Sequence, residues 1–215
     1  MWRLRFEVDL EDRPFFFDEA YKINLSQLFK AVLNGAHFVF SDIVPLKKKT
    51  VHGGFWALKQ AALFFTTPLQ DSLSTIVTRA LKTPLDFRYG SLKFKRAVFQ
   101  KVRFETTGYL ISPVSVLLPT GESMIWEREP ERYSEALRHD LIKKYENLYG
   151  EMPEDNRFFF SFVDGYEKEE TGDGFISYRG KFTVFGSKEL ITVAYLCGIG
   201  NLNEMGYGMI THEEG

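Results

Sequence analysis

Hydrophobic and polar residues alternate strictly at the start of the chain. The apolar positions there are Trp2, Leu4, Phe6, Val8 and Leu10, and charged residues fill the positions between them. A period of two places all the apolar side chains on one face of an extended chain. Residues 1–10 are therefore predicted to form a strand that is buried on one side.

The rest of the first half continues with segments of clear periodicity. Asn34 and Gly35 are typical of the end of a helix, and Pro68 is typical of the start of one. The order is strand, helix, strand, strand, helix, strand. After the first strand, the predicted elements are a helix over 23–36, strands over 37–44 and 60–67 on either side of a long basic connection, a helix over 68–82 and an extended stretch to Phe104.

The second half repeats this order. The sequence therefore predicts an α+β protein of two tandem ferredoxin-like (βαββαβ) domains, which occupy residues 1–104 and 105–215. The predicted elements of the second domain are strands over 109–119, 157–166, 174–186 and 204–212, and helices over 131–150 and 187–197.

Charge is distributed unevenly between the two halves. Although the net charge is −2, residues 1–104 hold 17 Lys and Arg against 9 Asp and Glu, whereas residues 105–215 hold 10 against 20. Such an asymmetry indicates that the first half binds a polyanion, unless its basic residues form an ordinary solvated face. The alternation in residues 92–104 predicts a ribbon with one basic and one apolar face. The candidate phosphate contacts are Lys47, Lys48, Lys49, Lys93, Lys95, Lys101 and Arg103 in the first half, with Arg179 and Lys181 in the second.

Several kinds of site are not expected. The single cysteine, Cys197, and four scattered histidines give no metal-ligand spacing, so neither a metal nor another cofactor is predicted. No apolar run approaches the roughly 20 residues of a membrane span, and the first residues do not resemble a signal peptide. A cytoplasmic protein without a membrane partner is therefore expected.

The stretch GIGNLNEMGYGM carries four glycines: Gly198, Gly200, Gly206 and Gly208. A dinucleotide-binding loop runs from a strand into a helix, but here the glycines follow a helix and precede a strand. The helix therefore presents its negative end, and only loop amides could hold a phosphate. Gly198 is predicted to end the helix, and the other three glycines are predicted to allow a close backbone approach.

The second half resembles the repeat-RNA processing endoribonucleases of CRISPR systems, members of the repeat-associated RNA-binding superfamily. The resemblance rests on the G-x-G-x(5)-G-x-G spacing of the four glycines, on SPVSV, and on GKFTVFG before the last helix. It implies that the loop, with Asn201 and Asn203, binds RNA. It also implies metal-independent cleavage of precursor CRISPR RNA within each repeat, in which the 2′-hydroxyl attacks to leave a cyclic phosphate and a 5′-hydroxyl.

Catalytic residues follow from the same resemblance. The family's histidine lies just after the first helix, where this chain has His37, with Lys30 as the cation for the phosphate and Tyr21 as a third candidate. Many relatives place that histidine on an additional short helix, which this chain lacks, so His52 in the lysine-rich connection is a rival base.

The partner implied is CRISPR repeat RNA, either single-stranded or folded as a hairpin. Assembly with an effector complex or as a homodimer is left open. A catalytically inactive RNA-binding protein, or subunit of an effector complex, is the main alternative. A tandem ferredoxin-like regulator that binds a small ligand is a third, and it would lack salt-sensitive RNA binding.

Overall fold

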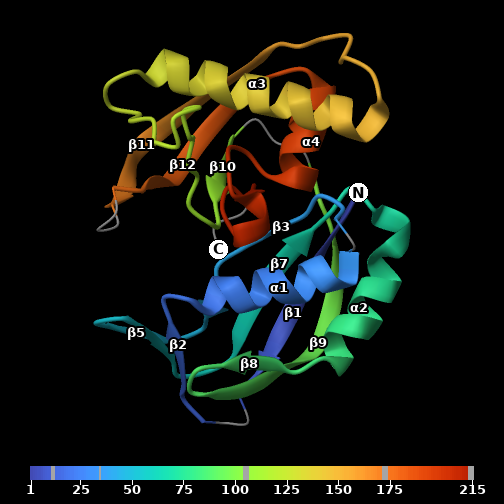
Figure 1. Cartoon of the computed structure of the whole chain (residues 1–215), viewed down its shortest axis with the longest axis vertical. Helices are drawn as coiled ribbons and strands as arrows, with labels where there is room; N and C mark the ends of the chain where they lie inside the picture. Colours follow the sequence, from blue (N-terminus) through green and yellow to red (C-terminus); the bar gives the residue numbers. More distant parts are fainter. Residues whose placement is uncertain (11–12, 34, 104–106, 171–173, 213–215) are drawn as a thin grey trace. The chain divides into compact units, whose positions relative to one another are not determined.

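The computed structural model describes residues 1–10, 13–33, 35–103, 107–170 and 174–212. These residues divide into two compact units (Figure 1). Unit 1 comprises residues 1–102 and 204–206, and unit 2 comprises residues 103–203 and 207–215. The boundary predicted between 104 and 105 lies outside the described residues, as does Asn34 of the predicted helix end, so both stay predictions.

Unit 1 is built on an antiparallel sheet in the order β3-β7-β1-β9-β8. Leu4 and Phe6 of β1 are fully buried, and the Phe6 ring lies 6.1 Å from that of Phe29 in α1. The predicted alternation is therefore confirmed for Leu4, Phe6 and Val8, but it is wrong at the start of the strand, where Trp2 is 45% exposed and Arg3 is 7% exposed. The elements of this layer are β1 (Trp2–Asp9), α1 (Tyr21–Leu33), β3 (Val39–Phe40), β4 (Val44–Pro45), β7 (Ala61–Thr66), the 3-10 helix η1 (Gln70–Ser72), α2 (Leu73–Lys82), β8 (Leu85–Phe87) and β9 (Gly90–Lys101).

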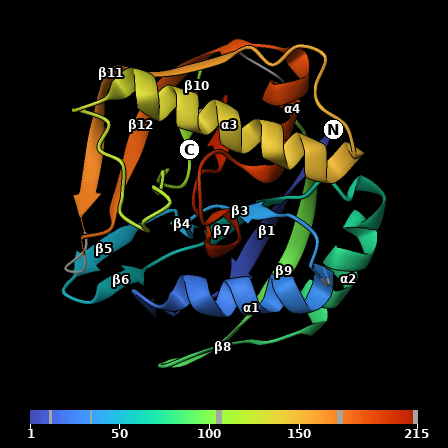
Figure 2. The ribbon, with the colours of Figure 1, turned by 45° about the horizontal axis from the view of Figure 1, so that its top comes forward.

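A second, three-stranded sheet in unit 1 was not predicted. Residues 45–59, expected to be a long connection, contain the hairpin of β5 (Lys48–Val51) and β6 (Gly54–Ala57) (Figure 2). β2 (Phe15–Asp18) pairs with β6. The turn is glycine-dependent, because Gly53 has φ +78° and Gly54 has φ +154°. Short strands flanked by lysines give a weak alternation signal, which explains why the sequence pattern missed this sheet.

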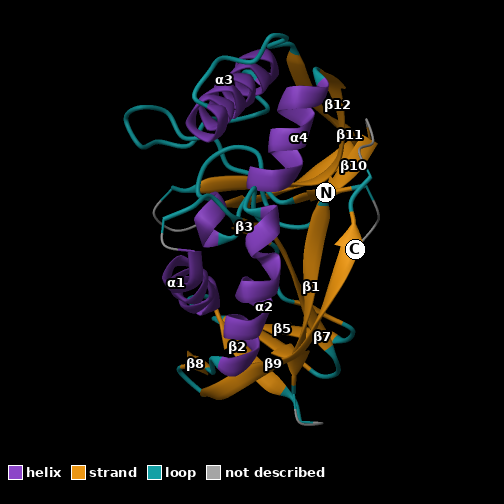
Figure 3. Ribbon diagram, turned by 90° about the vertical axis from the view of Figure 1, so that its right-hand side faces the viewer, coloured by secondary structure: helices purple, strands orange, loops and turns teal. Residues whose placement is uncertain are grey.

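Unit 2 contains a four-stranded antiparallel sheet in the order β11-β12-β10-β13. Counted along the chain, the strands of unit 2 are ordered 2-3-1-4, which is the ferredoxin-like arrangement, and β3, β7, β1 and β9 of unit 1 have the same order, with β8 added at the edge. Within each unit the helices cover one face of the sheet (Figure 3). The elements are β10 (Thr107–Leu110), α3 (Pro130–Tyr149), β11 (Phe158–Glu170), β12 (Ile176–Gly186), α4 (Lys188–Cys197), the 3-10 helix η2 (Asn203–Met205) and β13 (Ile210–Thr211).

Two predicted strands of unit 2 are shorter than expected. The strand predicted over 109–119 ends at Leu110, and that over 204–212 is reduced to β13. The residues before β13 are occupied by η2 and the glycine-rich loop, whose backbone bonds are satisfied elsewhere. No helix among the described residues has the length and apolar character needed to cross a bilayer.

Candidate nucleic-acid interface

The three predicted catalytic residues do not converge. Tyr21 begins α1 and His37 follows its end, so the helix rise of about 1.5 Å per residue separates them by roughly 18 Å along the axis. The chain after His37 runs back along α1, and at the far end Asp42 accepts a hydrogen bond of 3.2 Å from the Tyr21 hydroxyl. Lys30 lies nearer the His37 end of the helix, and its Nζ is 3.2 Å from Glu204 Oε2.

His37 is a half-buried residue in the connection between α1 and β3. Its backbone carbonyl accepts a hydrogen bond of 2.7 Å from the buried Thr67 hydroxyl. This bond fixes the backbone of the histidine while leaving its imidazole nitrogens out of the contact. The ring could therefore exchange a proton with a bound ligand.

His52 and the three lysines lie together on the β5–β6 hairpin. His52 is exposed at the turn, and Lys47, Lys48 and Lys49 are exposed along its first strand. The Lys48 ammonium sits 4.6 Å from the centre of the Phe55 ring. The hairpin is thus an exposed basic arm whose cations can reach phosphates.

A polar cluster that the sequence pattern did not reveal lies at the start of α1. Lys22 Nζ is 2.6 Å from Asp42 Oδ1 and donates to the Gly206 carbonyl at 3.2 Å, and Asp42 also accepts from Tyr21. Both side chains of the ion pair are largely shielded, with 15% and 19% exposure. Lys22 and Asp42 are 20 residues apart and only the fold joins them, so no spacing in the sequence announces them.

The prediction that the basic side chains of residues 92–104 share one face of the strand is wrong. A β-bulge breaks the register with β1, because Glu7 pairs with Arg96 whereas Val8 pairs with Phe94. Lys95 is the extra residue, and beyond it the alternation changes phase. Lys93 lies opposite Asp9 on the outer face, but Lys101 lies opposite Trp2 on the face that carries the core. Phe104 lies outside the described residues.

A cavity of about 650 Å³ opens beside this bulge in unit 1. Four cationic side chains line it (Arg13, Lys59, Lys95, Arg96), against the two acidic side chains Glu7 and Asp9. Arg96 donates to Glu7 at 2.6 and 2.8 Å, and this interaction lowers the pKa of that carboxyl despite the opposing effect of burial. The surplus of positive charge makes the cavity suited to an anion.

The glycine-rich loop has a strained backbone that only glycine accommodates. All four of its glycines have positive φ, between +70° and +79°. A Cβ on Gly208 would lie 1.8 Å from the Ile199 carbonyl oxygen, and one on Gly200 would lie 2.4 Å from that of Ser115. The close approach predicted for these glycines is therefore made within the protein, to backbone carbonyls at Gly200 and Gly208 and to the Phe40 ring at Gly206.

Amides of the loop also donate within the protein. Ile199 N–H donates to Gly208 O at 2.9 Å, Asn201 N–H to Ser115 O at 2.9 Å, and Gly208 N–H to Pro113 O at 2.7 Å. The Asn201 carboxamide oxygen accepts from Leu117 N–H, and the Asn203 amide nitrogen donates to Ile199 O and Tyr207 O. These amides and amide side chains thus hold the loop in place and are engaged before any ligand arrives.

A buried ion pair on α3 anchors the same loop. Lys144 is 8% exposed, and its Nζ contacts Asp140 Oδ2 at 2.5 Å and the carbonyls of Gly198 and Gly200 at 3.1 and 3.0 Å. The lysine therefore caps the negative end of α4 with a full positive charge. Lys144 lies on the same face of α3 as the apolar residues Leu137 and Leu141, and this spacing is the sequence signal that could have identified it as buried.

The two basic residues predicted on β12 differ in their contacts. Arg179 is half-buried and donates to the Ile111 carbonyl at 3.4 Å, and Lys181 Nζ lies 3.4 Å from Asp164. They are two residues apart on an unbroken stretch of the strand and share one face, as predicted.

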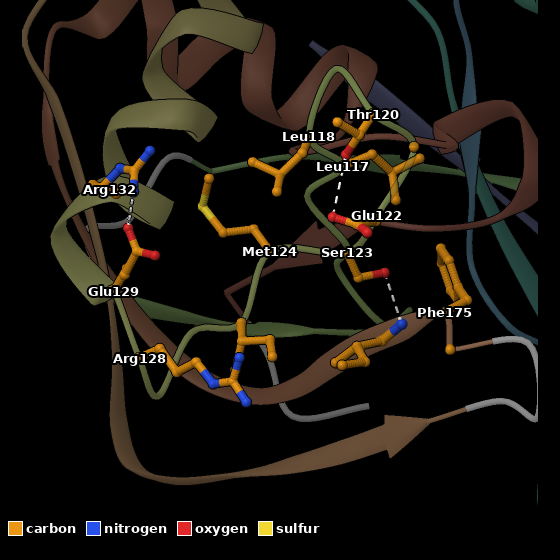
Figure 4. A pocket seen from close by; sticks show the side chains of 14 residues that line it. Leu117, Leu118, Thr120, Glu122, Ser123, Met124, Arg128, Glu129, Arg132 and Phe175 are labelled. Carbon is orange, nitrogen blue, oxygen red and sulfur yellow. Dashed lines mark hydrogen bonds and ion pairs between the residues drawn. The ribbon is translucent and has the colours of Figure 1, made fainter.

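A larger cavity, of about 870 Å³, lies in unit 2 between the segment 117–129 and the start of β12 (Figure 4). Arg128 and Arg132 line it together with Glu122 and Glu129, and Arg132 pairs with Glu129 (Figure 4). Because its charges balance, this cavity lacks the positive potential that draws in a polyanion. Among the residues that the structure describes, no group of three or more His, Cys, Asp and Glu side chains is placed to hold a metal ion.

Known proteins resemble the chain along its whole length. A CRISPR-associated endoribonuclease-like protein of Pyrococcus horikoshii, Cas6nc, is 25% identical, with 96% of this chain and 98% of the relative covered. A CRISPR-associated endoribonuclease Cas6 of Methanocaldococcus jannaschii is 30% identical over 141 residues, which span 64% of this chain and 51% of the relative.

The fold is that of solved relatives. A structure described as CRISPR associated protein Cas6 superposes with a TM-score of 0.79 at 20% identity and covers 99% of both chains. The family model described as "CRISPR associated protein Cas6, C-terminal" matches residues 95–212, more than half of the chain and including the entire glycine-rich loop. The protein therefore belongs to the Cas6 family of CRISPR-associated proteins.

Proposed function

We propose that this protein binds the repeat RNA of a CRISPR transcript and cleaves it without a metal ion. The 2′-hydroxyl next to the scissile phosphate attacks, and the products carry a cyclic phosphate and a 5′-hydroxyl. The observation that carries the proposal is the family match over residues 95–212. The surplus of basic residues in the first half supports a polyanionic substrate.

His37 is our candidate for the general base or acid. It follows α1, its backbone carbonyl is held by Thr67, and its half-buried imidazole takes no part in that bond. Lys30, near the same end of the helix, would stabilise the phosphorane by exchanging its exposed partner Glu204 for the phosphate. Tyr21 does not fit this site because its hydroxyl is bonded to Asp42 at the opposite end of α1.

Cleavage of end-labelled repeat RNA in chelator tests the proposal. We expect His37→Ala to lower the cleavage rate by about 10²- to 10⁴-fold, since it removes a proton-transfer group. His52→Ala tests the rival base. His139→Ala is the matched control, because that histidine is exposed on α3 beside Glu135. Loss of cleavage in His52→Ala alone would transfer the role to the hairpin, and equal rates in all variants would remove both histidines from the mechanism.

The dispersal of the expected catalytic trio favours a second candidate function, RNA binding without cleavage. Tyr21 is bonded away from His37, and Lys30 is ion-paired. A non-cleaving protein would bind repeat RNA with an affinity that falls with salt, at a log–log slope of roughly −0.7 per phosphate contact. Tight, salt-sensitive binding by a wild type that leaves the RNA intact would select this candidate. A small-ligand regulator would show neither property.

A further inference from the structure

The three-stranded sheet of unit 1 carries an aromatic row on its outer face. Phe16 of β2, Trp56 of β6 and Lys49 of β5 are direct cross-strand neighbours. The Phe16 ring centre lies 5.3 Å from that of Trp56 and 5.2 Å from that of Tyr89, in the turn between β8 and β9. The β5–β6 hairpin, β2 and the β8–β9 turn thus bring three aromatic rings and a lysine into one row.

These rings remain accessible to solvent. Trp56 is 38% exposed and Tyr89 is 57% exposed, whereas Phe17 and Phe55 on the inner face of the same sheet are 0% and 7% exposed. The inner pair stacks at 5.3 Å within the core of unit 1. The core therefore uses one face of the sheet, and among the described residues of unit 1 no helix or strand lies over the aromatic row on the other face.

The backbone is adapted to keep the row in place. A Cβ on Gly54 would lie 2.1 Å from the Phe17 carbonyl oxygen and 2.8 Å from the tip of the Phe16 ring, so glycine allows both the backbone of β2 and this ring to approach β6. Phe16 is held between its two neighbours, tilted at 49° to Trp56 and at 74° to Tyr89. The exposed faces of Trp56 and Tyr89 are consequently fixed before any ligand binds.

Cationic groups flank the row. Lys49 adjoins Trp56, and the Arg88 guanidinium lies 5.4 Å from the centre of the Tyr89 ring. The nearest carboxylate on the sheet is Asp18, which accepts a hydrogen bond of 3.1 Å from Ala20 N–H. Lys47 and Lys48 add to the positive charge at the edge.

We infer that this face is a stacking platform for unpaired RNA bases, formed by Trp56 and Tyr89 over Phe16, with Lys49 and Arg88 contacting the flanking phosphates. Exposed aromatic rings beside a basic groove are the combination with which proteins hold single-stranded nucleic acid regardless of sequence. Aromatic residues and arginine are enriched at protein interfaces as well, but lysine is depleted there, so the lysines beside the row favour RNA over a protein partner. The inference rests on the proposed RNA-binding function and extends it to a segment of RNA beside the cleaved bond.

Binding of a fluorescent single-stranded oligouridylate about ten nucleotides long tests the platform. We expect Trp56→Ala and Tyr89→Ala each to weaken binding between about fivefold and a hundredfold, because stacking of one base is lost. Trp56→Phe retains a ring and should restore most of the affinity. Tyr149→Ala is the matched control: that tyrosine is 52% exposed, but it lies on α3 among acidic residues.

A second readout reports contact directly. Stacking of a base on Trp56 should quench part of the intrinsic fluorescence, and this RNA-dependent quenching should disappear in Trp56→Phe although binding persists. Wild-type affinity in both alanine variants, or quenching unchanged in Trp56→Phe, would overturn the platform and leave the face to another partner.

Cleavage of repeat RNA separates this inference from the proposed function. If wild type cleaves the repeat and the platform variants bind the oligonucleotide normally, the platform is wrong and the proposed function stands. If wild type does not cleave but the variants lose binding, the platform stands and the cleavage activity does not. Failure of wild type to bind either RNA would reject both.

Discussion

Two connections that lead from a helix to a strand carry the functional expectations, and they are held very differently. The connection after α4 is fixed by Lys144, Asn201 and Asn203 and by its own backbone bonds. The connection after α1 is fixed chiefly through the bond from Thr67 to the carbonyl of His37. Groups already bonded within the protein cannot serve a ligand without loss. The comparison teaches that the polar groups of the glycine-rich loop are used to hold its shape, whereas in the described part of the histidine connection the bond from Thr67 uses only the backbone of His37.

Replacement of a glycine in the glycine-rich loop is expected to have the largest effect on the free energy of unfolding. Gly208→Ala would drive a Cβ into the Ile199 carbonyl at positive φ, so we expect a loss of about 4 kcal/mol or more in the free energy of unfolding. Urea unfolding measures it. Gly150→Ala is the control, because Gly150 has φ +76° with open space around it, and it should lose only about 1 kcal/mol. Equal losses would show that φ alone, without the backbone contact, sets the effect.

Removal of the buried Lys144 side chain is expected to have the second-largest effect on the free energy of unfolding. Lys144→Met leaves the partly buried carboxylate of Asp140 without its partner and two loop carbonyls without their donor, which we expect to lower the free energy of unfolding by about 3 kcal/mol. Replacing both members, in Asp140→Asn with Lys144→Met, should recover part of the loss.

Cys197 provides a local readout for the same variant. Burial raises the pKa of its thiol to about 12, so alkylation near pH 8 should be very slow in the wild type and should accelerate tenfold for each pH unit toward that value. Loss of the Lys144 charge raises the pKa of this thiol further, so faster alkylation of the Lys144→Met variant, which we expect, would report opening at the end of α4 and not a change in the thiol's electrostatics. An unchanged alkylation rate would mean that the loop stays closed without the lysine.

A substitution that affects the connection after α1 is expected to lower the free energy of unfolding by less. Thr67→Val removes the hydroxyl that donates to His37 O and accepts from Leu69 N–H, and we expect a loss of about 1 kcal/mol in the free energy of unfolding. Thr78→Val, on the exposed face of α2, is the matched control and should change stability by less than about 0.5 kcal/mol. A loss as large as that of Lys144→Met would abolish the contrast between the two connections.

The smallest effect on stability is expected at His37 itself. His37→Ala should alter the free energy of unfolding by about 0.5 kcal/mol or less, because only the backbone of His37 is used in its contact with Thr67. The same variant is expected to lose cleavage, so stability and activity should separate here. If unfolding and cleavage were impaired together, the histidine would be a structural residue.

The sequence predicted those parts of the fold that depend on local periodicity. The strand β1, the helix α4 ending before Gly198 and the ferredoxin-like strand order all follow from spacing and turn residues. The β5–β6 hairpin was missed because half of its side chains are lysines or small residues at an exposed edge. Long-range pairing created the Lys22–Asp42 cluster, which no local pattern encodes.

The candidate site was predictable only as a set of residue types. The glycine positions and His37 followed from motif resemblance, but the contacts of Tyr21 and Lys30 depend on where the chain returns after α1. Lys144 was overlooked because an Asp140–Lys144 pair four residues apart is typical of an exposed helix, although its burial gives it another role.

The bulge at Lys95 has a consequence for any chain aligned with this one. It divides β9 into two stretches of opposite phase, so odd-numbered positions face outward before it and even-numbered positions face outward after it. In a relative that lacks the additional residue, the strand would keep one phase throughout. It could then keep Arg96 and Val98 on the outer face or Leu92 and Phe94 on the buried face, but not both. One inserted residue thus allows a single strand to serve two surfaces with independent chemical demands.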